Sequence, residues 1–344
     1  MTWYRIHQRD LPWRRTRSAY RIWVSEVMLQ QTQVETVIPY YRRFIRRFPS
    51  LSALASSDLE AVLKVWEGLG YYSRARHLLE ASQIIARDYR GRIPRDLQVF
   101  LRLPGVGDYI GAAVLSIAFQ KPYAAVDGNV KRVLSRLQAI DLPMNASASS
   151  RVFKHAAQAL LDRDAPGISN QAFMEFGALQ CIPRNPLCNC CPLRRLCKAY
   201  QSNTVKRLPN RGSRRTVPTR HVAVGVVYNR DRVLITRRAP RGLLGGLWEF
   251  PGGAIGADES ARAACLREIR EETGLSVTVG DHLATVRHAY THFKVVIDVF
   301  RCAYQGGTVH LSGPVDFRWV SIAELDQFAF PSANKKFMHL LIRR

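Results

Sequence analysis

The hydrophobic period of this chain changes near residue 210, and that change limits the folds open to it. Before residue 200 apolar residues recur at spacings of three and four, which predicts helices, most clearly over 59–69, 74–87, 108–119, 128–139 and 151–162. After residue 220 the period drops to two, which predicts strands at 221–228, 232–238, 276–279 and 295–304 around one helix at 259–273. A chain of 344 residues is also too long for one ordinary core. We therefore expect a multidomain protein, an all-α domain followed by an α+β domain.

Residues 201–220 separate the two patterns. They hold six basic residues, no acidic ones and two prolines, a composition typical of a linker that lies along a polyanion. The predicted domains are 1–200 and 221–344, joined by this basic linker at 201–220.

The positive charge of the chain is concentrated before residue 221. Of 51 basic and 27 acidic residues, 35 and 15 fall in residues 1–220, which leaves 16 and 12 after them. A basic half beside a nearly neutral half is typical of a nucleic-acid binder with an appended module, although surface lysines and arginines can also serve solubility alone.

Membrane insertion and secretion are not indicated. The longest apolar run, Gly111 to Phe119, is about half of what a membrane helix needs, and the first residues show no apolar signal region. We expect a cytoplasmic protein if the source is bacterial.

Five of the seven cysteines lie between Cys181 and Cys197. The spacing of Cys181, Cys188, Cys191 and Cys197 is C-x6-C-x2-C-x5-C, and four thiolates in one short loop suit a tetrahedral zinc ion or a cubane iron–sulfur cluster. A disulfide set is less consistent with a chain that shows no secretion signal.

Two short motifs in the helical half could carry chemistry. Leu103-Pro104-Gly105-Val106-Gly107 lies between two helical stretches, and Gly105 and Gly107 permit a tight hairpin whose free backbone N–H groups suit a phosphate oxygen. The alternative is a plain helix–helix turn. Asp127 opens the helix that follows, and taken alone it is best explained as an N-cap.

Together these motifs resemble the helix-hairpin-helix DNA glycosylases, and in particular the MutY-type adenine DNA glycosylases. The resemblance rests on Leu11–Arg14, Ser25–Val34, Gly68–Arg76, the hairpin and Val126–Arg132, in this order. It covers nearly the whole chain. It implies an enzyme that hydrolyses the N-glycosidic bond of adenine in base excision repair.

The implied chemistry needs one protonated and one ionised carboxyl group, because the base must leave neutral while positive charge grows on the sugar. By resemblance, Glu26 is the acid and Asp127 stabilises the sugar cation. The apolar neighbours of Glu26 favour its protonated form.

Tyr109 occupies the position where the strand-nicking endonuclease III-like relatives carry a lysine that forms a Schiff base. Tyrosine cannot form an imine, so the resemblance implies a monofunctional enzyme that acts through water, with Tyr109 and Asn129 supporting Asp127. A strand-nicking enzyme is disfavoured accordingly.

Other residues are implied in DNA contact. By resemblance Gln30, Gln31 and Tyr71 wedge into the duplex at the mispair, and an aromatic side chain suits that role. Asp108, directly after the hairpin, departs from what a phosphate contact requires, although an acidic residue suits a helix N-terminus.

The resemblance also implies that the four spaced cysteines bind a [4Fe–4S] cluster that closes the helical domain at residues 181–197. We interpret Cys190 as a cysteine that does not bind it.

From residue 221 the chain resembles a Nudix-like domain, which this family uses to recognise 8-oxoguanine opposite the adenine. Tyr290, Thr291 and His292 match the loop that probes the lesion, where Phe-Ser-His is usual. The alternative is that this segment is a surface strand end.

This domain has kept a full Nudix box, whereas related domains have generally lost it. Glu268, Glu271 and Glu272 share one helical face, and such a cluster suits Mg²⁺ holding a pyrophosphate. The alternative is that Arg267 and Arg270 neutralise that face and leave a scaffold without a substrate.

We therefore predict a monomeric adenine DNA glycosylase acting on double-stranded DNA with 8-oxoguanine:adenine or guanine:adenine mispairs. The alternative is a bifunctional protein whose Nudix box also hydrolyses a nucleoside diphosphate derivative such as an oxidised dNTP. A lesion-binding protein without activity is disfavoured, because both carboxyl residues are present.

Overall fold

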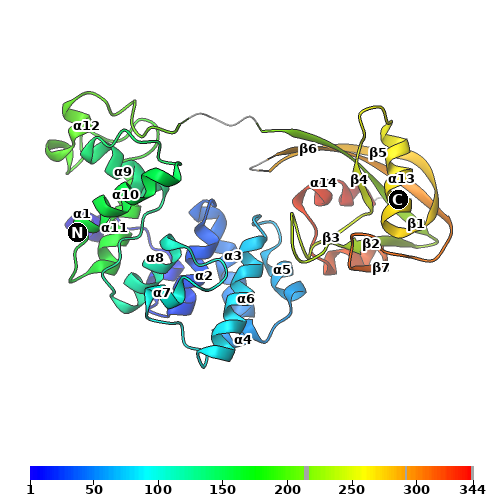
Figure 1. The fold of residues 1–344 in the computed structure, drawn as a ribbon, viewed down its shortest axis with the longest axis horizontal. Coiled ribbons are helices and arrows are strands. Elements are labelled where there is room, and N and C mark those ends of the chain that lie inside the picture. The colour runs from blue at the N-terminus through cyan, green and yellow to red at the C-terminus, as the bar shows by residue number, and fades with distance from the viewer. Residues whose placement is uncertain (213–216, 291–292, 342–344) are drawn as a thin grey trace. The chain divides into compact units, whose positions relative to one another are not determined.

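The computed structural model describes residues 1–212, 217–290 and 293–341, which form two compact units (Figure 1). The first unit contains Met1–Ser56 and His77–Arg214, and the second contains Ser57–Arg76 and Arg215–Arg344. The segment Ser57–Arg76 thus belongs by its contacts to the unit formed by the last third of the chain.

The first unit is helical, as its sequence predicts. Its elements are α1 (Thr2–His7), η1 (Pro12–Arg15), α2 (Ala19–Leu29), α3 (Val34–Arg47), α4 (Leu51–Ala55), most of α6 (Ser73–Asp88), α7 (Leu97–Phe100), α8 (Asp108–Phe119), α9 (Gly128–Gln138), α10 (Ser147–Ala159), α11 (Pro166–Leu179), η2 (Arg194–Leu196) and α12 (Lys198–Gln201).

Helices α2 and α8 form the centre of this unit. Both are buried over most of their length, and Ser18 caps the start of α2 by accepting a hydrogen bond from the Arg21 N–H at 3.4 Å. A helix that is apolar on nearly all sides needs neighbours on all sides. Glu26, on the buried part of α2, is therefore held away from bulk water.

The second unit is a seven-stranded mixed sheet with helices. Strands pair in the order β3-β2-β1-β6-β5, with β4 added to β1 and β7 to β2, and the β1–β6 pair is parallel. Its elements are α5 (Leu59–Trp66), β1 (Thr219–Asn229), β2 (Arg232–Arg237), β3 (Trp248–Glu249), β4 (Gly252–Ala254), α13 (Ala261–Thr273), β5 (Ser276–Ala289), β6 (Lys294–Gly306), β7 (Asp316–Ser321), η3 (Ile322–Gln327) and α14 (Ser332–Leu341).

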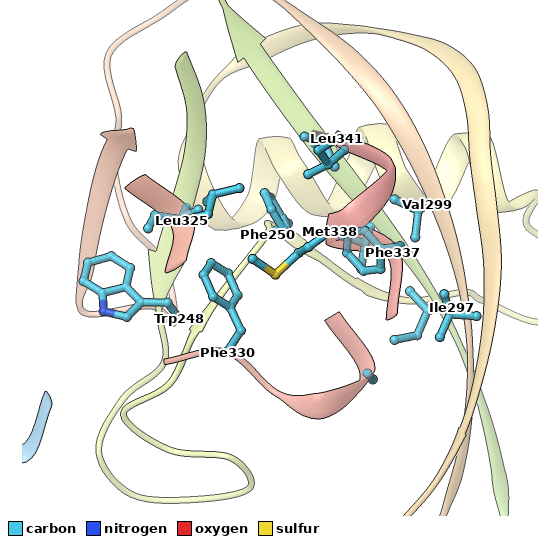
Figure 2. Close-up of a cluster of buried hydrophobic side chains, with 14 of the residues drawn as sticks. Trp248, Phe250, Ile297, Val299, Leu325, Phe330, Phe337, Met338 and Leu341 are labelled. Carbon is cyan, nitrogen blue, oxygen red and sulfur yellow. The ribbon is translucent and has the colours of Figure 1, made fainter. Parts of the chain in front are cut away.

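Each face of this sheet carries its own core. Side chains alternate along a strand, so Val224 and Val226 of β1 join the cluster that contains α14, whereas Ala223 and Val227 join the one that contains α13. Figure 2 shows the first cluster, where Phe250, Phe330 and Phe337 lie together. The second unit is thus a sheet between helices, and α13 carries the acidic residues of the box.

The sequence pattern predicts the elements well and their limits less well. The helix expected at 259–273 is α13, but the strand expected at 276–279 extends to Ala289, and the short β3 and β4 leave no period to detect. The segment predicted as a linker is partly packed, because Leu208 is buried and its carbonyl accepts a hydrogen bond from Arg136 at 2.9 Å. No helix in the described ranges is long and apolar enough to cross a membrane.

Candidate active site

Glu26 lies on the central helix α2 and is only 5% exposed. The pKa of its carboxyl group is raised to about 7, chiefly by burial and in addition by the nearby charge of Asp127. A hydrogen bond from Tyr109 and the charge of Arg14 oppose this rise. A carboxyl group with such a pKa still holds a proton near neutral pH, as a general acid must.

Tyr109 of α8 donates a hydrogen bond to Glu26 Oε2, and its hydroxyl lies 3.4 Å from Met174 Sδ. Burial raises the pKa of Tyr109 well above its ordinary value, and the negative charges of Glu26 and Asp127 raise it further. The phenol therefore stays protonated and acts as a donor. Glu26, Tyr109 and Asp127 are close enough in space to influence one another, as the sequence predicts.

Asp127 is the N-cap of α9, and its carboxylate is tightly held. Oδ1 accepts a hydrogen bond from the Val130 N–H at 2.7 Å, and Oδ2 accepts one from Asn129 Nδ2 at 2.9 Å. Burial raises the pKa of Asp127, while these two donors and the charge of Arg132 oppose the rise. The capping explanation and the catalytic one are thus compatible at the same residue.

Asn129 is held in turn by Arg132, whose Nη2 donates to Asn129 Oδ1 at 2.8 Å and to the Gly177 carbonyl at 2.6 Å. A Cβ at Gly177 would lie 2.6 Å from Asn129 Cβ, so glycine is required where α11 approaches α9. The orientation of Asn129 depends on both neighbours.

The glycine hairpin has the geometry expected of it. Gly105 adopts φ +73°, and a Cβ there would lie 2.7 Å from His77 Cβ. Gly107 is the N-cap of α8 and offers no side chain to the first N–H groups. Asp108 pairs with Lys154 at 3.1 Å, so its charge is offset at the helix start.

Two buried polar residues outside the predicted set were missed by sequence reasoning. Glu175 of α11 is 1% exposed and accepts hydrogen bonds from both Arg9 and Arg14, with the paired Nη2–Oε2 distances at 2.8 Å. These two arginines lower the pKa of Glu175 to about 2 despite its burial. Asn170 accepts from the Ala125 N–H at 2.9 Å and so fixes the approach to Asp127. The available signal was a polar residue type at a position that the pattern would bury. That signal does not identify the partners, because they lie far apart in the sequence.

The residues predicted to wedge into DNA lie at unusual backbone positions. Gln30 ends α2, and Gln31 and Tyr71 have left-handed backbones with φ +57° and +49°. Gln30 and Gln31 belong to the first unit and Tyr71 to the second. The Arg74 guanidinium lies 5.1 Å from the centroid of the Tyr71 ring.

The predicted lesion loop is described only at its first residue. Tyr290 stacks on Phe293 with ring centroids 4.7 Å apart, and burial raises its pKa to about 12. Thr291 and His292 lie outside the described residues.

The four spaced cysteines line a single cavity together with Arg136, while Cys190 is exposed and does not line it. Arg136 Nη1 lies 3.4 Å from Cys181 Sγ and donates to the Ile182 carbonyl at 2.7 Å. Across the described ranges, no three cysteine, histidine, aspartate or glutamate side chains are arranged as a ready metal site.

The box glutamates of α13 face an arginine. Arg267 contacts Glu268 at 2.8 Å and Glu271 at 3.0 Å, and it also binds Glu259. Glu272 accepts from the Gly252 N–H at 3.1 Å, and burial raises its pKa to about 7. The arrangement therefore matches the predicted alternative in which arginine neutralises the acidic face, although only Arg267 shows these contacts.

Two family models match this chain. One describes HhH-GPD superfamily base excision DNA repair proteins and matches residues 24–157, and the other describes a NUDIX domain and matches residues 223–340. The helical prediction and the C-terminal one are both confirmed.

Individual proteins are similar over most of the chain. The adenine DNA glycosylase of Rattus norvegicus is 37% identical, with 98% of this chain and 76% of the relative aligned. That of Homo sapiens is 36% identical, with 98% and 72% aligned. The solved structure of a thermostable thymine-DNA glycosylase covers 58% of this chain and 93% of its own, with 32% identity and a TM-score of 0.54.

Proposed function

Because the chain belongs to the adenine DNA glycosylase family, a group of base excision repair enzymes that act on DNA, we propose that it removes adenine mispaired with 8-oxoguanine or guanine. We further propose that it does so as a monofunctional enzyme. The observation that carries this proposal is the buried Glu26, with a pKa of about 7, beside Tyr109 and the capped Asp127.

Glu26 supplies the proton that turns adenine into a neutral leaving group. The Tyr109 hydroxyl orients its carboxyl group, and burial keeps the proton on it near neutral pH. The N-glycosidic bond then breaks and its electron pair leaves with the base.

Asp127 stabilises the positive charge that develops on the sugar. Its donors Val130 N–H and Asn129 Nδ2 fix the carboxylate in place, so little reorganisation is needed as the charge appears. Water then adds to the sugar and gives its proton to the carboxylate of Glu26, which restores the acid. No amine stands at position 109, so no imine joins the enzyme to DNA.

Three groups of residues are proposed to engage the duplex. The hairpin glycines Gly105 and Gly107 leave N–H groups at the start of α8 for a phosphate, and the basic charge of the first 220 residues supports the same contact. Gln30, Gln31 and Tyr71 are the proposed wedge. Tyr290, Thr291 and His292 are the proposed readers of the opposite base.

We also propose a [4Fe–4S] cluster on Cys181, Cys188, Cys191 and Cys197. The fit is supported by the shared cavity, by the exclusion of Cys190 from it, and by a donor set of four thiols. When bound, the cluster would supply a structural tie for the loop. Arg136 supports the loop from within, through its bonds to the 182 and 208 carbonyls.

For the Nudix box the contacts favour a scaffold. We propose Mg²⁺ on Glu268, Glu271 and Glu272 only on the condition that the metal displaces Arg267. The Arg267 guanidinium now forms ion pairs with Glu268 and Glu271. Incubation with Mg²⁺ and dNTPs, 8-oxo-dGTP or ADP-ribose tests it, with Glu271→Gln/Glu272→Gln as control. Release of phosphate or pyrophosphate that disappears in the control would establish the second activity.

The main proposal is tested by single-turnover release of adenine from duplexes with 8-oxoguanine, guanine or thymine opposite. We expect excision opposite the first two, no borohydride-trapped adduct, and a loss of about 10²–10⁴-fold in Glu26→Gln. Fast excision opposite thymine, or by Glu26→Gln, would contradict the assignment. Sedimentation of the free enzyme tests the proposed monomer, and fractionation of a bacterial source tests the proposed cytoplasmic location.

A further inference from the structure

We propose that Glu67 is a positioning residue through which the C-terminal sheet holds the loop of Tyr71 in the conformation that enters DNA. The inference rests on the proposed wedge role of Tyr71. It adds that the same unit that reads the opposite base also supports the wedge.

The side chain of Glu67 is 7% exposed and is bound on both carboxylate oxygens. Oε1 accepts a hydrogen bond from the Phe330 N–H at 2.9 Å, and Oε2 accepts from Lys335 at 2.6 Å and from Lys64 at 3.0 Å. Phe330 is fully buried in the core cluster shown in Figure 2. Glu67 is the C-cap of α5. Its carboxylate is therefore held by one backbone donor and one side-chain donor of the C-terminal part.

A second set of contacts holds the rest of α5. Glu60 Oε1 accepts from Trp248 Nε1 at 3.1 Å, and Lys64 Nζ donates to the Phe328 carbonyl at 3.1 Å. A Cβ at Gly246 would lie 3.0 Å from Leu63 Cδ1 and 3.1 Å from Leu59 Cδ2. Helix and sheet thus meet through apolar contact as well as through hydrogen bonds.

The loop that follows Glu67 is short and strained. Gly68, Gly70 and Tyr71 all have positive φ, and for tyrosine the left-handed region costs about 1 kcal/mol or more. Within the loop, Tyr72 OH accepts from the Gly68 N–H at 3.2 Å and Trp66 Nε1 donates to the Gly70 carbonyl at 3.1 Å. Such a conformation persists only where its surroundings fix it. Glu67, directly before the loop, joins this segment to the C-terminal part through Phe330 and Lys335.

The proposed lesion loop lies close to this segment. The Tyr72 hydroxyl is near enough to Tyr290 to contribute to the raised pKa of Tyr290, after the larger effect of burial. Tyr72 follows Tyr71 directly, and Tyr290 precedes the two residues proposed to probe 8-oxoguanine. The wedge and the reader are therefore attached to one framework.

The test compares Glu67→Ala, Glu67→Gln and Trp248→Phe in the full-length protein, with Glu80→Gln, an exposed glutamate of α6, as matched control. Extrusion of the target base is followed by 2-aminopurine fluorescence, excision by single-turnover kinetics, and order in residues 68–72 by amide hydrogen exchange. We expect Glu67→Ala to slow extrusion about tenfold opposite 8-oxoguanine and guanine alike, to lower protection of the loop, and to leave the KM for DNA nearly unchanged.

Glu67→Gln retains an oxygen for the Phe330 N–H and is expected to recover part of the rate. If Glu67→Ala does not fold, Trp248→Phe, which keeps an aromatic ring in the core but removes the donor to Glu60 and part of the buried indole, is expected to show the same loss of loop protection. If Glu67→Ala and Trp248→Phe both show wild-type extrusion and wild-type loop protection, while Tyr71→Ala still slows extrusion, the inference is overturned. A fully active Tyr71→Ala would overturn the wedge role and this inference together, and absence of any adenine release by wild type would overturn the proposed function itself.

Discussion

Glu26 is an acid because of where α2 places it, between apolar neighbours that favour the neutral form and a phenol that favours the charged one. Burial is the larger influence, and it raises the pKa of Glu26 to about 7. Tyr109 works in the opposite direction and limits the rise. The group is thereby kept near the pH at which proton donation is most efficient.

The first prediction concerns pH. Because the protonated form of Glu26 and the ionised form of Asp127 are the active ones, the single-turnover rate should fall as pH rises through about 7, and it should also fall at low pH, where Asp127 takes up a proton. A pH–rate profile for the chemical step checks this. A rate that increases across the same range would assign Glu26 the role of a base.

The second prediction concerns Tyr109→Phe. Its hydroxyl donates to Glu26 and so favours the carboxylate, and its removal should move the falling limb of the profile to higher pH. The same profile, recorded for both proteins, measures the displacement. A limb that moves to lower pH would show that the hydrogen bond acts mainly on the protonated form.

The third prediction concerns Glu175, whose pKa lies at about 2 because Arg9 and Arg14 bind it. Its charge stabilises the fold above the ordinary pKa of 4.5, and that contribution is lost as pH falls toward 2. Glu175→Gln should cost about 2–3 kcal/mol of unfolding free energy at pH 7, since the arginines are partly buried. Urea unfolding at several pH values should show the difference shrinking on acidification; a constant difference would exclude the ionic explanation.

At this scale Glu26, Tyr109, Asp127 and Asn129 are predicted because each stands in a local motif that resembles one of the family; without that resemblance Asp127 would be explained as an N-cap alone. Glu175 could not be predicted in the same way. Arg9 is 166 residues away, and nothing local distinguishes a buried glutamate from a solvated one.

Helix α9 shows how one residue can serve an element and a reaction together. Asp127 caps the helix through the Val130 N–H and carries the charge proposed to face the sugar. An asparagine can form the same cap, whereas alanine cannot. The two roles can therefore be separated by substitution.

The fourth prediction follows from this difference. The Asp127→Asn variant should unfold at the wild-type temperature, but its excision rate should fall at least about a hundredfold. The Asp127→Ala variant should lose the activity and also about 1 kcal/mol of unfolding free energy. Thermal unfolding and single-turnover assays on both variants check it. Equal destabilisation by the two substitutions would mean that charge, and not the cap, supports α9.

Helices and strands are easier to predict from the sequence when they are long and when their apolar residues lie on one face. Helices with a clear apolar face, such as α5 and α9, appear where the period places them. Strand β5 runs ten residues beyond its predicted end because several of its later residues are exposed or half-buried and interrupt the alternation. Two-residue β3 is defined by its pairing with β2, which no local pattern encodes.

The division of the whole molecule does not follow chain order. Ser57–Arg76 lies within the helical sequence but packs with residues after 215. The sequence gives no sign of this, because the apolar face of α5 fits a helical partner as well as a sheet. The linear domains 1–200 and 221–344 remain a prediction about sequence units.

The fifth prediction concerns a chain cut after residue 212. Loss of the partners of Leu59 and Leu63 should remove about 2 kcal/mol, which corresponds to a Tm lower by about 4–8 °C for a unit of this size. Calorimetry of fragment 1–212 beside the chain ending at residue 341 checks this. An unchanged Tm would show that α5 is stable without the sheet. If the Tm falls, addition of fragment 217–344 should raise it back toward that of the intact chain.

The contact between Glu60 and Trp248, 188 residues apart, has a consequence for how the protein is made. At about 5–20 residues per second, a ribosome needs roughly 10–40 s to synthesise the partner of a helix that has already emerged. During that interval the apolar side of α5 has nothing to pack against, and the nascent chain offers it to chaperones or to other chains. Residues 68–72, the loop of the proposed wedge residue Tyr71, are thus among the last parts of the helical sequence to reach their final conformation. A polypeptide released before residue 330 would leave the ribosome with this loop not yet held by its partners.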